Sequence, residues 1–172
     1  FFFKQKTAYE ISTRDWSSDV CSSDLGHLQR NKLRRTLPLL ALLHSLDSPR
    51  LLEAIEREAA AIGRPCDVLV EVNIAGDPGR TGVMEAHLEP LLEAAVRSPH
   101  VRVQGLMGMA SASDGADGLA TARRQFARLR ELRDRLARNL PAAACLRELS
   151  MGMSGDYAEA ILEGATMVRI GS

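Results

Sequence analysis

Short apolar runs alternate with amphipathic stretches along most of the chain, a pattern typical of parallel α/β folds. Four apolar runs predict strands, at residues 68–74, 101–110, 146–151 and 166–170. A fifth run at 40–46 also predicts a strand, although its leucines would suit a helix as well. The runs are nearly continuous in apolar character, which indicates strands buried on both faces.

Four amphipathic stretches between these runs predict helices. The first begins with Ser48 as N-cap and Pro49 at the first helical position, and Gly63 closes it. The second covers 88–96, and a short fourth one runs over 156–163. The third is the clearest, because its apolar residues recur three or four positions apart: Leu119, Ala122, Phe126, Leu129, Leu132 and Leu136.

The polar face of the third helix is rich in arginine. A solvated outer surface is the expected role of this cluster, and a basic ligand-binding stripe is the alternative. The cluster comprises Arg123, Arg124, Arg128, Arg130, Arg133, Arg135 and Arg138.

The strand–helix alternation predicts either a (β/α)8 barrel or an open sheet, and the spacing alone does not choose between them. In both architectures ligands bind at the C-terminal ends of strands. One such end, 149–156, is rich in small residues that let backbone N–H groups approach an anion, and Ser154 adds a hydroxyl. Asp156 could serve simply as a helix N-cap. This segment is a candidate phosphate site.

Arg169 marks a second candidate strand end. A buried guanidinium is costly without a partner, which favours a functional placement, whereas an Arg that extends to solvent is the alternative. Gly171 and Ser172 follow it and could supply N–H and hydroxyl donors. A phosphate held between two adjoining strand ends is a recurrent feature of such barrels.

Other features limit the possible functions. The glycine-rich segment 76–82 lacks the Gly-Lys-[Ser/Thr] ending of a P-loop and predicts a plain mobile loop. The four histidines have no metal-ligand spacing, so no metal site is expected. Zero net charge argues against nucleic-acid binding, and no apolar run is long enough to span a membrane. Cys21, Cys66 and Cys145 suggest reduced thiols in a cytoplasmic protein.

Residues 1–25 differ in composition from the rest, since they hold three of the four Phe and the only Trp. Segments 4–11 and 15–25 look like an in-frame translation of sequencing-library adapter DNA. A targeting peptide is the alternative, but no apolar stretch follows the opening residues and several acidic ones do. We therefore expect 1–25 to be a non-native, disordered segment and 26–172 to be the native domain.

Six segments of that domain, in order, resemble the pyridoxal 5′-phosphate homeostasis proteins, relatives of the alanine racemase N-terminal barrel. They correspond to the family's third to eighth strand ends: 26–32, 44–48, 72–74 with its glycine-rich loop, 105–109, 149–156 and 168–172. The resemblance implies a TIM barrel of fold type III that binds pyridoxal 5′-phosphate (PLP). It is incomplete here, because the family's first two strand–helix units would precede residue 26.

The resemblance also assigns roles to residues. It implies that Ser154 and the Gly171-Ser172 turn hold the phosphate with Met153 beside it, and that Arg169 faces the pyridine nitrogen. A permanent cation there would weaken the ring as an electron sink. The implied function is storage and delivery of PLP in the cytoplasm, without turnover and without catalytic residues. The protein is expected to be a monomer whose partners are PLP and PLP-dependent apoenzymes.

Departures from the family pattern leave alternatives open. Arg80 stands where the family usually has Lys, and Ser172 where it usually has Thr. The family's Schiff-base lysine belongs to the first strand and is absent, and Lys32 does not replace it. Because two strands of the barrel are missing, we expect this chain to fold poorly. An amino-acid racemase is one alternative; it would need an opposing acid/base, usually a tyrosine from an added domain. A barrel for another phosphorylated small molecule is the other.

Overall fold

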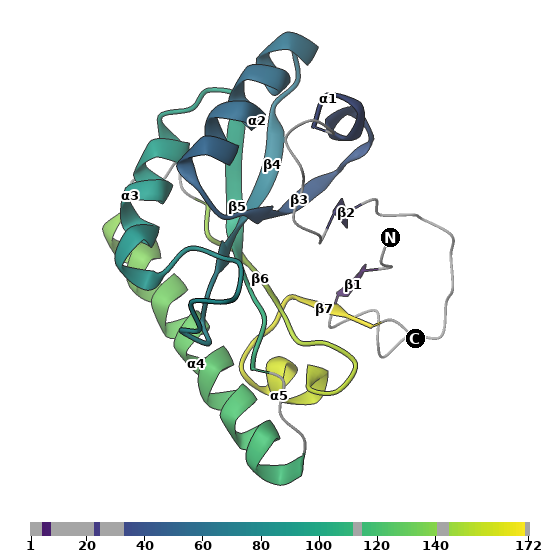
Figure 1. Cartoon of the computed structure of the whole chain (residues 1–172), viewed down its shortest axis with the longest axis vertical. Coiled ribbons are helices and arrows are strands. Elements are labelled where there is room, and N and C mark those ends of the chain that lie inside the picture. The colour runs from purple at the N-terminus through teal and green to yellow at the C-terminus, as the bar shows by residue number, and fades with distance from the viewer. Residues whose placement is uncertain (1–4, 8–22, 25–32, 112–114, 141–144, 171–172) are drawn as a thin grey trace.

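A single curled sheet organises the chain, whose computed structural model describes residues 5–7, 23–24, 33–111, 115–140 and 145–170. The order of its seven strands is β1-β7-β6-β5-β4-β3-β2 (Figure 1). Neighbours from β2 to β7 pair in parallel, and only β1 is antiparallel, against β7. The strands are β1 (Gln5–Thr7), β2 (Ser23–Asp24), β3 (Leu42–Leu46), β4 (Cys66–Val72), β5 (Val101–Gly108), β6 (Glu148–Met151) and β7 (Met167–Arg169).

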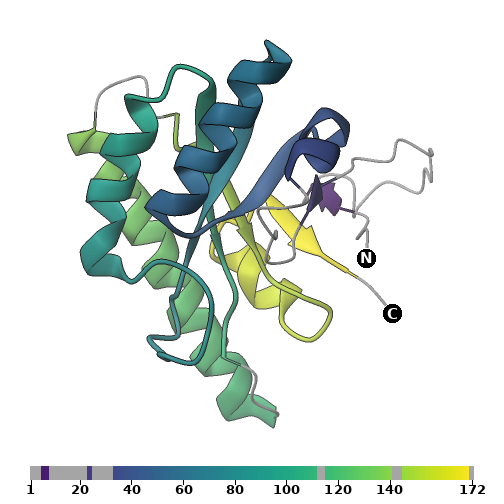
Figure 2. The same ribbon diagram turned by 45° about the horizontal axis from the view of Figure 1, so that its top comes forward.

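Helices α2, α3 and α4 cover the outer face of this sheet, and α5 connects β6 to β7 (Figures 1 and 2). The strand–helix alternation expected from the apolar pattern is therefore present, and each of the five predicted strands is found. The helical elements are α1 (Leu33–Thr36), the 3-10 turn η2 (Leu37–Leu39), α2 (Pro49–Ile62), α3 (Glu85–Val96), α4 (Gly115–Asn139) and α5 (Tyr157–Leu162).

The two faces of the sheet differ in chemistry. Along β4, Val68, Val70 and Val72 belong to the apolar core under the helices. Side chains alternate along a strand, so the intervening positions face the inside of the curl. Glu71 is one of these and is buried, as are His44 on β3, Ser150 on β6 and Arg169 on β7.

A hydrogen bond across the inside of the sheet shows that the sheet is strongly curved. His44 on β3 and Ser150 on β6 lie 3.1 Å apart, between Nδ1 and Oγ. Strands β4 and β5 separate them in the strand order, so a flat sheet would hold them roughly 14 Å apart at about 4.8 Å per strand. The sheet is therefore curved like part of a barrel, with β1 and β2 at its two edges, which confirms the predicted incomplete TIM barrel.

The ends of α2 lie where the sequence signals predict, but the predicted N-cap residue does not make a capping hydrogen bond. Gly63 ends α2 in the left-handed conformation, at φ 71°, as predicted. Ser48 does occupy the N-cap position, yet its hydroxyl donates to Asp47 Oδ1 at 2.9 Å and makes no capping bond. The expectation that Leu119 lies on the buried face of α4 is wrong, since this side chain is 39% exposed. It lies near the N-terminus of α4, which begins at Gly115.

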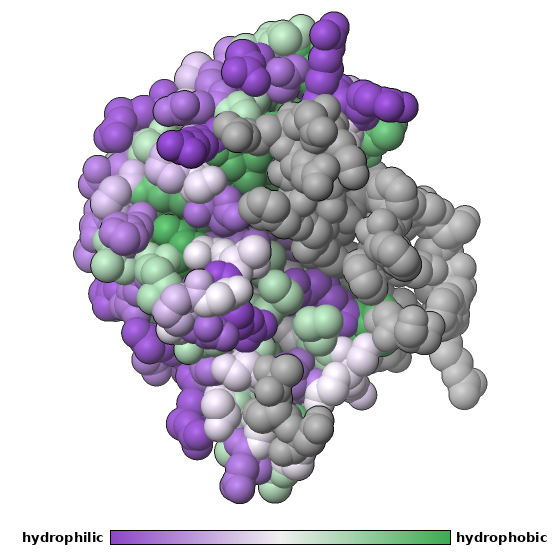
Figure 3. All heavy atoms as spheres, in the orientation of Figure 1, coloured by the Kyte–Doolittle hydropathy of each residue, from purple (hydrophilic) through white to green (hydrophobic). Residues whose placement is uncertain are grey.

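The arginine-rich face of α4 is tied to its neighbours by ion pairs. Arg128 and Arg135 both contact Glu85 of α3, at 2.7 and 2.9 Å. Arg123 and Arg130 both contact Glu163 beside α5, at 2.9 and 3.2 Å. This face agrees with the predicted outer surface, and hydrophilic side chains line the same outer rim of the molecule in Figure 3. It also fixes α5 against α4.

The predicted division at residue 25 is not tested, because most of 1–25 lies outside the described residues. The parts described there are β1 and β2, which pair with β7 and β3. Among the described helices, none combines the length and apolar character that a bilayer crossing requires.

Candidate functional site

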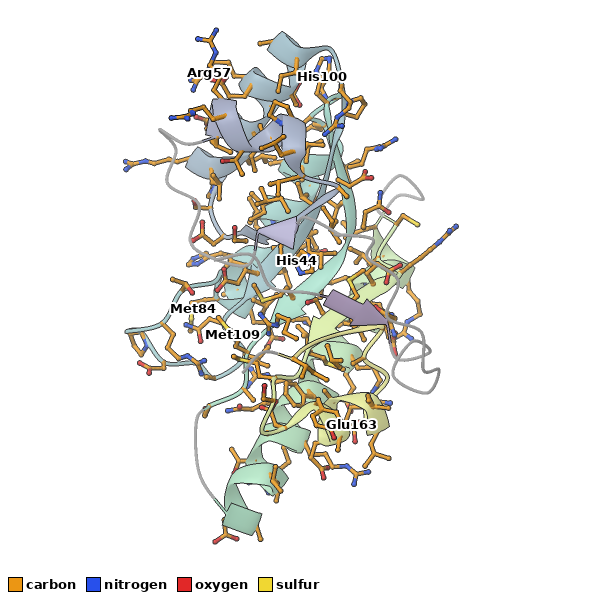
Figure 4. The ribbon with its side chains drawn as sticks, turned by 90° about the vertical axis from the view of Figure 1, so that its right-hand side faces the viewer. His44, Arg57, Met84, His100, Met109 and Glu163 are labelled. Carbon is orange, nitrogen blue, oxygen red and sulfur yellow. The ribbon has the colours of Figure 1, made fainter. Side chains whose placement is uncertain are left out.

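The strongest concentration of buried polar side chains lies inside the curl, toward the carboxyl ends of the strands. Four different strands contribute side chains that are each at most 5% exposed: His44, Glu71, Ser150 and Arg169. Their positions follow from the two-residue alternation of the strands, which turns these side chains away from the apolar helical core. Figure 4 shows His44, which belongs to β3, near the middle of the molecule.

Arg169 is turned into this interior. Its Nη2 donates to the Gly108 carbonyl at 3.2 Å, and its Nη1 lies 3.6 Å from the Met107 sulfur. Its Nε is buried and has no partner among the described residues. Burial lowers the pKa of Arg169, while Glu71 and Asp156 act in the opposite direction. The alternative of an arginine extended to solvent is therefore wrong, and the guanidinium keeps an unmet donor.

The ends of β6 and β7 adjoin, as the phosphate hypothesis requires. Ser150 pairs with Met167, and the Arg169 N–H donates to the Gly152 carbonyl at 3.0 Å. Gly152 adopts φ 93°, and a Cβ there would lie 2.6 Å from Ala160 of α5. Glycine is thus required where the strand turns closely past the helix.

The segment that follows Gly152 is exposed, with Met153 at 47% and Ser154 beside it. Asp156 occupies the helix N-cap position without capping α5; its Oδ1 instead accepts the Met153 N–H at 2.6 Å. The expectation that Asp156 serves simply as the helix N-cap is therefore wrong. Gly171 and Ser172, the other predicted phosphate ligands, lie outside the described residues, so the complete cradle stays a prediction.

The glycine-rich loop 76–82 is tied to the strand ends, in contrast to the mobile loop expected. Thr81 Oγ1 donates to Glu71 Oε1 at 2.5 Å, and Arg80 donates to the Ala110 carbonyl at 2.9 Å. Gly82 makes the return possible, because it adopts φ 99° and a Cβ there would lie 2.8 Å from the Asn73 nitrogen. The loop therefore closes over the ends of β4 and β5.

Sequence reasoning missed His44, Glu71 and Ser150 as site residues. Burial, with a smaller effect of Arg169, lowers the pKa of His44 from 6.5 to about 3, so its imidazole is neutral near pH 7. The sequence did carry a signal for such residues: a polar side chain within an otherwise apolar strand, such as Glu71 in β4, indicates a position on the inner face of the sheet. His44 was considered as a metal ligand and as part of the family-like segment 44–48, but it was given no ligand contact; within the described ranges no group of metal-ligating side chains gathers.

The structure also has a small surface pocket away from these residues. It lies at the outer, helical side and is lined by residues that include Asn73, Met84, Glu85 and Leu132. Glu85 there is engaged by two arginines, whose hydrogen bonds lower the pKa of its carboxyl. The pocket is thus separate from the inner face that carries Arg169.

Comparisons with known proteins agree with this arrangement. The family model described as alanine racemase, N-terminal domain, matches residues 24–172. The chain is 40% identical over 148 residues to the pyridoxal phosphate homeostasis protein of Aquifex aeolicus, across 86% of this chain and 63% of the relative. The pyridoxal phosphate homeostasis protein of Vibrio alginolyticus is 34% identical over 149 residues, across 86% of this chain and 61% of the relative. The chain thus spans a little under two thirds of these relatives.

Solved structures resemble the fold closely. PipY of Synechococcus elongatus PCC7942 with PLP bound superposes with a TM-score of 0.80 at 33% identity, across 89% of this chain and 69% of that one. An alanine racemase of Clostridium difficile 630 reaches 0.66 at 14% identity, across 87% and 37%, and this likeness concerns the fold alone. The chain therefore belongs to the alanine racemase N-terminal domain family, with relatives named pyridoxal phosphate homeostasis proteins.

Proposed function

We propose that this chain binds pyridoxal phosphate inside the curl of its sheet, and that the whole protein holds and delivers this cofactor. The observation that carries the proposal is the buried guanidinium of Arg169, with an unmet Nε donor, beside the adjoining ends of β6 and β7. The 40% identical relative named for PLP homeostasis and the structure of PipY with PLP bound support it.

Arg169 is the residue we assign to the ring nitrogen. PLP, when bound, supplies an electron sink that stabilises carbanions. A guanidinium stays protonated and presents only donors, so it would favour the unprotonated ring nitrogen and weaken that sink. We therefore propose a site that retains PLP without using it in turnover.

The phosphate is assigned to the segment after β6 and to the chain end after β7. Ser154 would contribute its hydroxyl and Met153 its position beside the group, with Gly171 and Ser172 completing the cradle. The charge of Asp156 is a cost to this arrangement, because its carboxylate holds the Met153 N–H that faces the same segment. Anion binding there has to overcome that carboxylate.

Further properties of the whole protein are part of the proposal. PLP-dependent apoenzymes are the proposed recipients, and a monomer is the proposed state. Cys66 and Cys145 carry free thiols, which supports a reducing compartment such as the cytoplasm. The exposed Tyr157, at the first turn of α5, is not an opposing acid/base inside the curl, so no racemase activity is proposed.

Titration calorimetry with PLP tests the proposal, on purified chain that a cooperative thermal melt first shows to be folded. We expect saturable binding, weakened at least about tenfold in Arg169→Gln, since a hydrogen bond from a charged donor is worth about 1.5–3 kcal/mol. Arg102→Gln is the control, because Arg102 is exposed and pairs with Asp67 at 2.7 Å on the other end of the sheet. Absence of PLP binding by the unaltered chain would overturn the proposal.

A further inference from the structure

His44 has a second nitrogen, Nε2, that finds no partner in the described parts of the chain. The side chain is completely buried, and its Nδ1 is held by Ser150 at 3.1 Å across the curl. Its Nε2 is buried and makes no hydrogen bond to any described residue. Buried polar groups are nearly always satisfied, so this atom needs a partner that the described residues do not supply.

Counting hydrogens at the His44–Ser150 pair identifies which kind of partner is needed. If Nδ1 carried the proton, the Ser150 hydroxyl hydrogen would lack an acceptor among the described residues, and Nε2 would be an unmet acceptor. If the Ser150 hydroxyl donates to Nδ1, only the Nε2–H group is left unmet. The second arrangement leaves fewer groups unsatisfied, so Nε2 is a donor that needs an acceptor.

The surroundings of His44 favour an electron-rich acceptor. Arg169 is close enough to lower the pKa of His44 further, and its own Nε is an unmet buried donor. The inner face thus offers two unmet N–H donors, on β3 and β7. A neutral imidazole and a guanidinium together suit an aromatic ligand that carries acceptors on its ring.

We propose that His44 is a specificity-determining residue that donates its Nε2–H to an oxygen substituent on the ring of the bound ligand. The inference rests on the proposed function and deepens it, because PLP carries a hydroxyl oxygen on the ring besides the phosphate and the ring nitrogen. Ser150 is the positioning residue, which holds the imidazole in the donor tautomer. The site then distinguishes vitamin-B6 phosphates from pyridine phosphates that lack this oxygen.

Calorimetry with two ligands tests the assignment. PLP and its 3-deoxy analogue, which lacks the ring hydroxyl, are titrated into the unaltered chain, His44→Phe and His44→Gln. We expect the unaltered chain to prefer PLP by about tenfold, the low end for a hydrogen bond to a charged acceptor. His44→Phe should abolish this preference, and His44→Gln, which keeps an amide donor, should restore part of it.

The matched control is His100→Phe, because His100 is half-exposed and pairs with Glu56 at 2.7 Å away from the curl. It should retain the full preference for PLP. An equal preference in His44→Phe and the unaltered chain would overturn the inference while leaving PLP binding intact. Failure of the unaltered chain to bind PLP would overturn both, so the two failures are distinguishable.

A second measurement does not depend on the ligand or on the folding of a variant. Nitrogen-15 NMR of the unaltered chain distinguishes the two neutral imidazole tautomers of His44. The inference requires the proton on Nε2 and an unprotonated Nδ1 facing Ser150. A proton on Nδ1 would overturn it.

Discussion

The imidazole of His44 meets the hydroxyl of Ser150 across the inside of the sheet, at 3.1 Å and 106 positions apart in the chain. This bond joins β3 to β6 without passing through β4 and β5, which lie between them. It therefore reports barrel curvature directly and places a neutral ring next to Arg169. Both the fold and the proposed ligand site depend on it.

Removal of the Ser150 hydroxyl should destabilise the chain. Ser150→Ala leaves both nitrogens of a buried imidazole without partners, which costs about 1–3 kcal/mol of unfolding free energy. Urea denaturation measures this loss. Ser98→Ala is the control, since Ser98 bonds the Ala94 carbonyl at the end of α3, where it is less buried. Equal losses in the two variants would contradict a structural role for the cross-sheet bond.

Stability should fall as the pH drops below about 6.5. The pKa of His44 is about 3 in the folded chain and 6.5 as its ordinary value. Unfolding therefore takes up a proton between these values, and the stability present above pH 6.5 is lost on going down toward pH 3.

The slope due to this one group is at most about 1.4 kcal/mol per pH unit. Urea denaturation between pH 6.5 and 5, above the range where most carboxylates titrate, measures it. His44→Gln should flatten the slope in that interval. An unchanged slope in this variant would show that His44 is not buried in its neutral form.

Neutralising Asp156 should strengthen PLP binding. Asp156→Asn keeps an oxygen for the Met153 N–H but removes a negative charge from the proposed phosphate segment. Relief of about 1 kcal/mol of repulsion, the value for two unit charges about 4 Å apart in water, corresponds to an affinity gain of about fivefold by calorimetry. Asp134→Asn on the outer face of α4, where Asp134 pairs with Arg133, should change nothing. Weaker binding by Asp156→Asn would argue against phosphate at this segment.

The turn at Gly82 should not tolerate a side chain. Gly82→Ala places a Cβ 2.8 Å from the Asn73 nitrogen at φ 99°, so something in the loop has to shift. We expect a loss of about 1–3 kcal/mol in thermal unfolding. Gly155→Ala, with ordinary φ and nothing within 4 Å of its Cβ, should be close to neutral. Equal melting temperatures of the two variants would contradict the close return of the loop.

Local sequence signals predicted the elements well because they act within one turn or one strand. Pro49 and Gly63 bracket α2 correctly, since a fixed φ and a left-handed residue are local properties. The side chain of Ser48 was not predictable in the same way, because Asp47 competes for its hydroxyl.

The candidate site was only partly predictable. Arg169 could be found, because a charged residue in a short apolar strand end is unusual. The pairing of His44 with Ser150 could not, since it arises only when the sheet curls and brings β3 to β6. Thr81 reaches Glu71 for a similar reason, through a loop return that depends on Gly82.

The Nε–H resonance of Arg169 offers the most direct test of the central claim, that a buried guanidinium contacts bound PLP. This group is buried without a described partner, so its NMR signal should be distinct. We predict that saturating PLP shifts it, while the Nε–H of Arg102, bonded to Asp67 at 2.7 Å, stays in place. An unmoved Arg169 signal at saturating PLP would contradict the account.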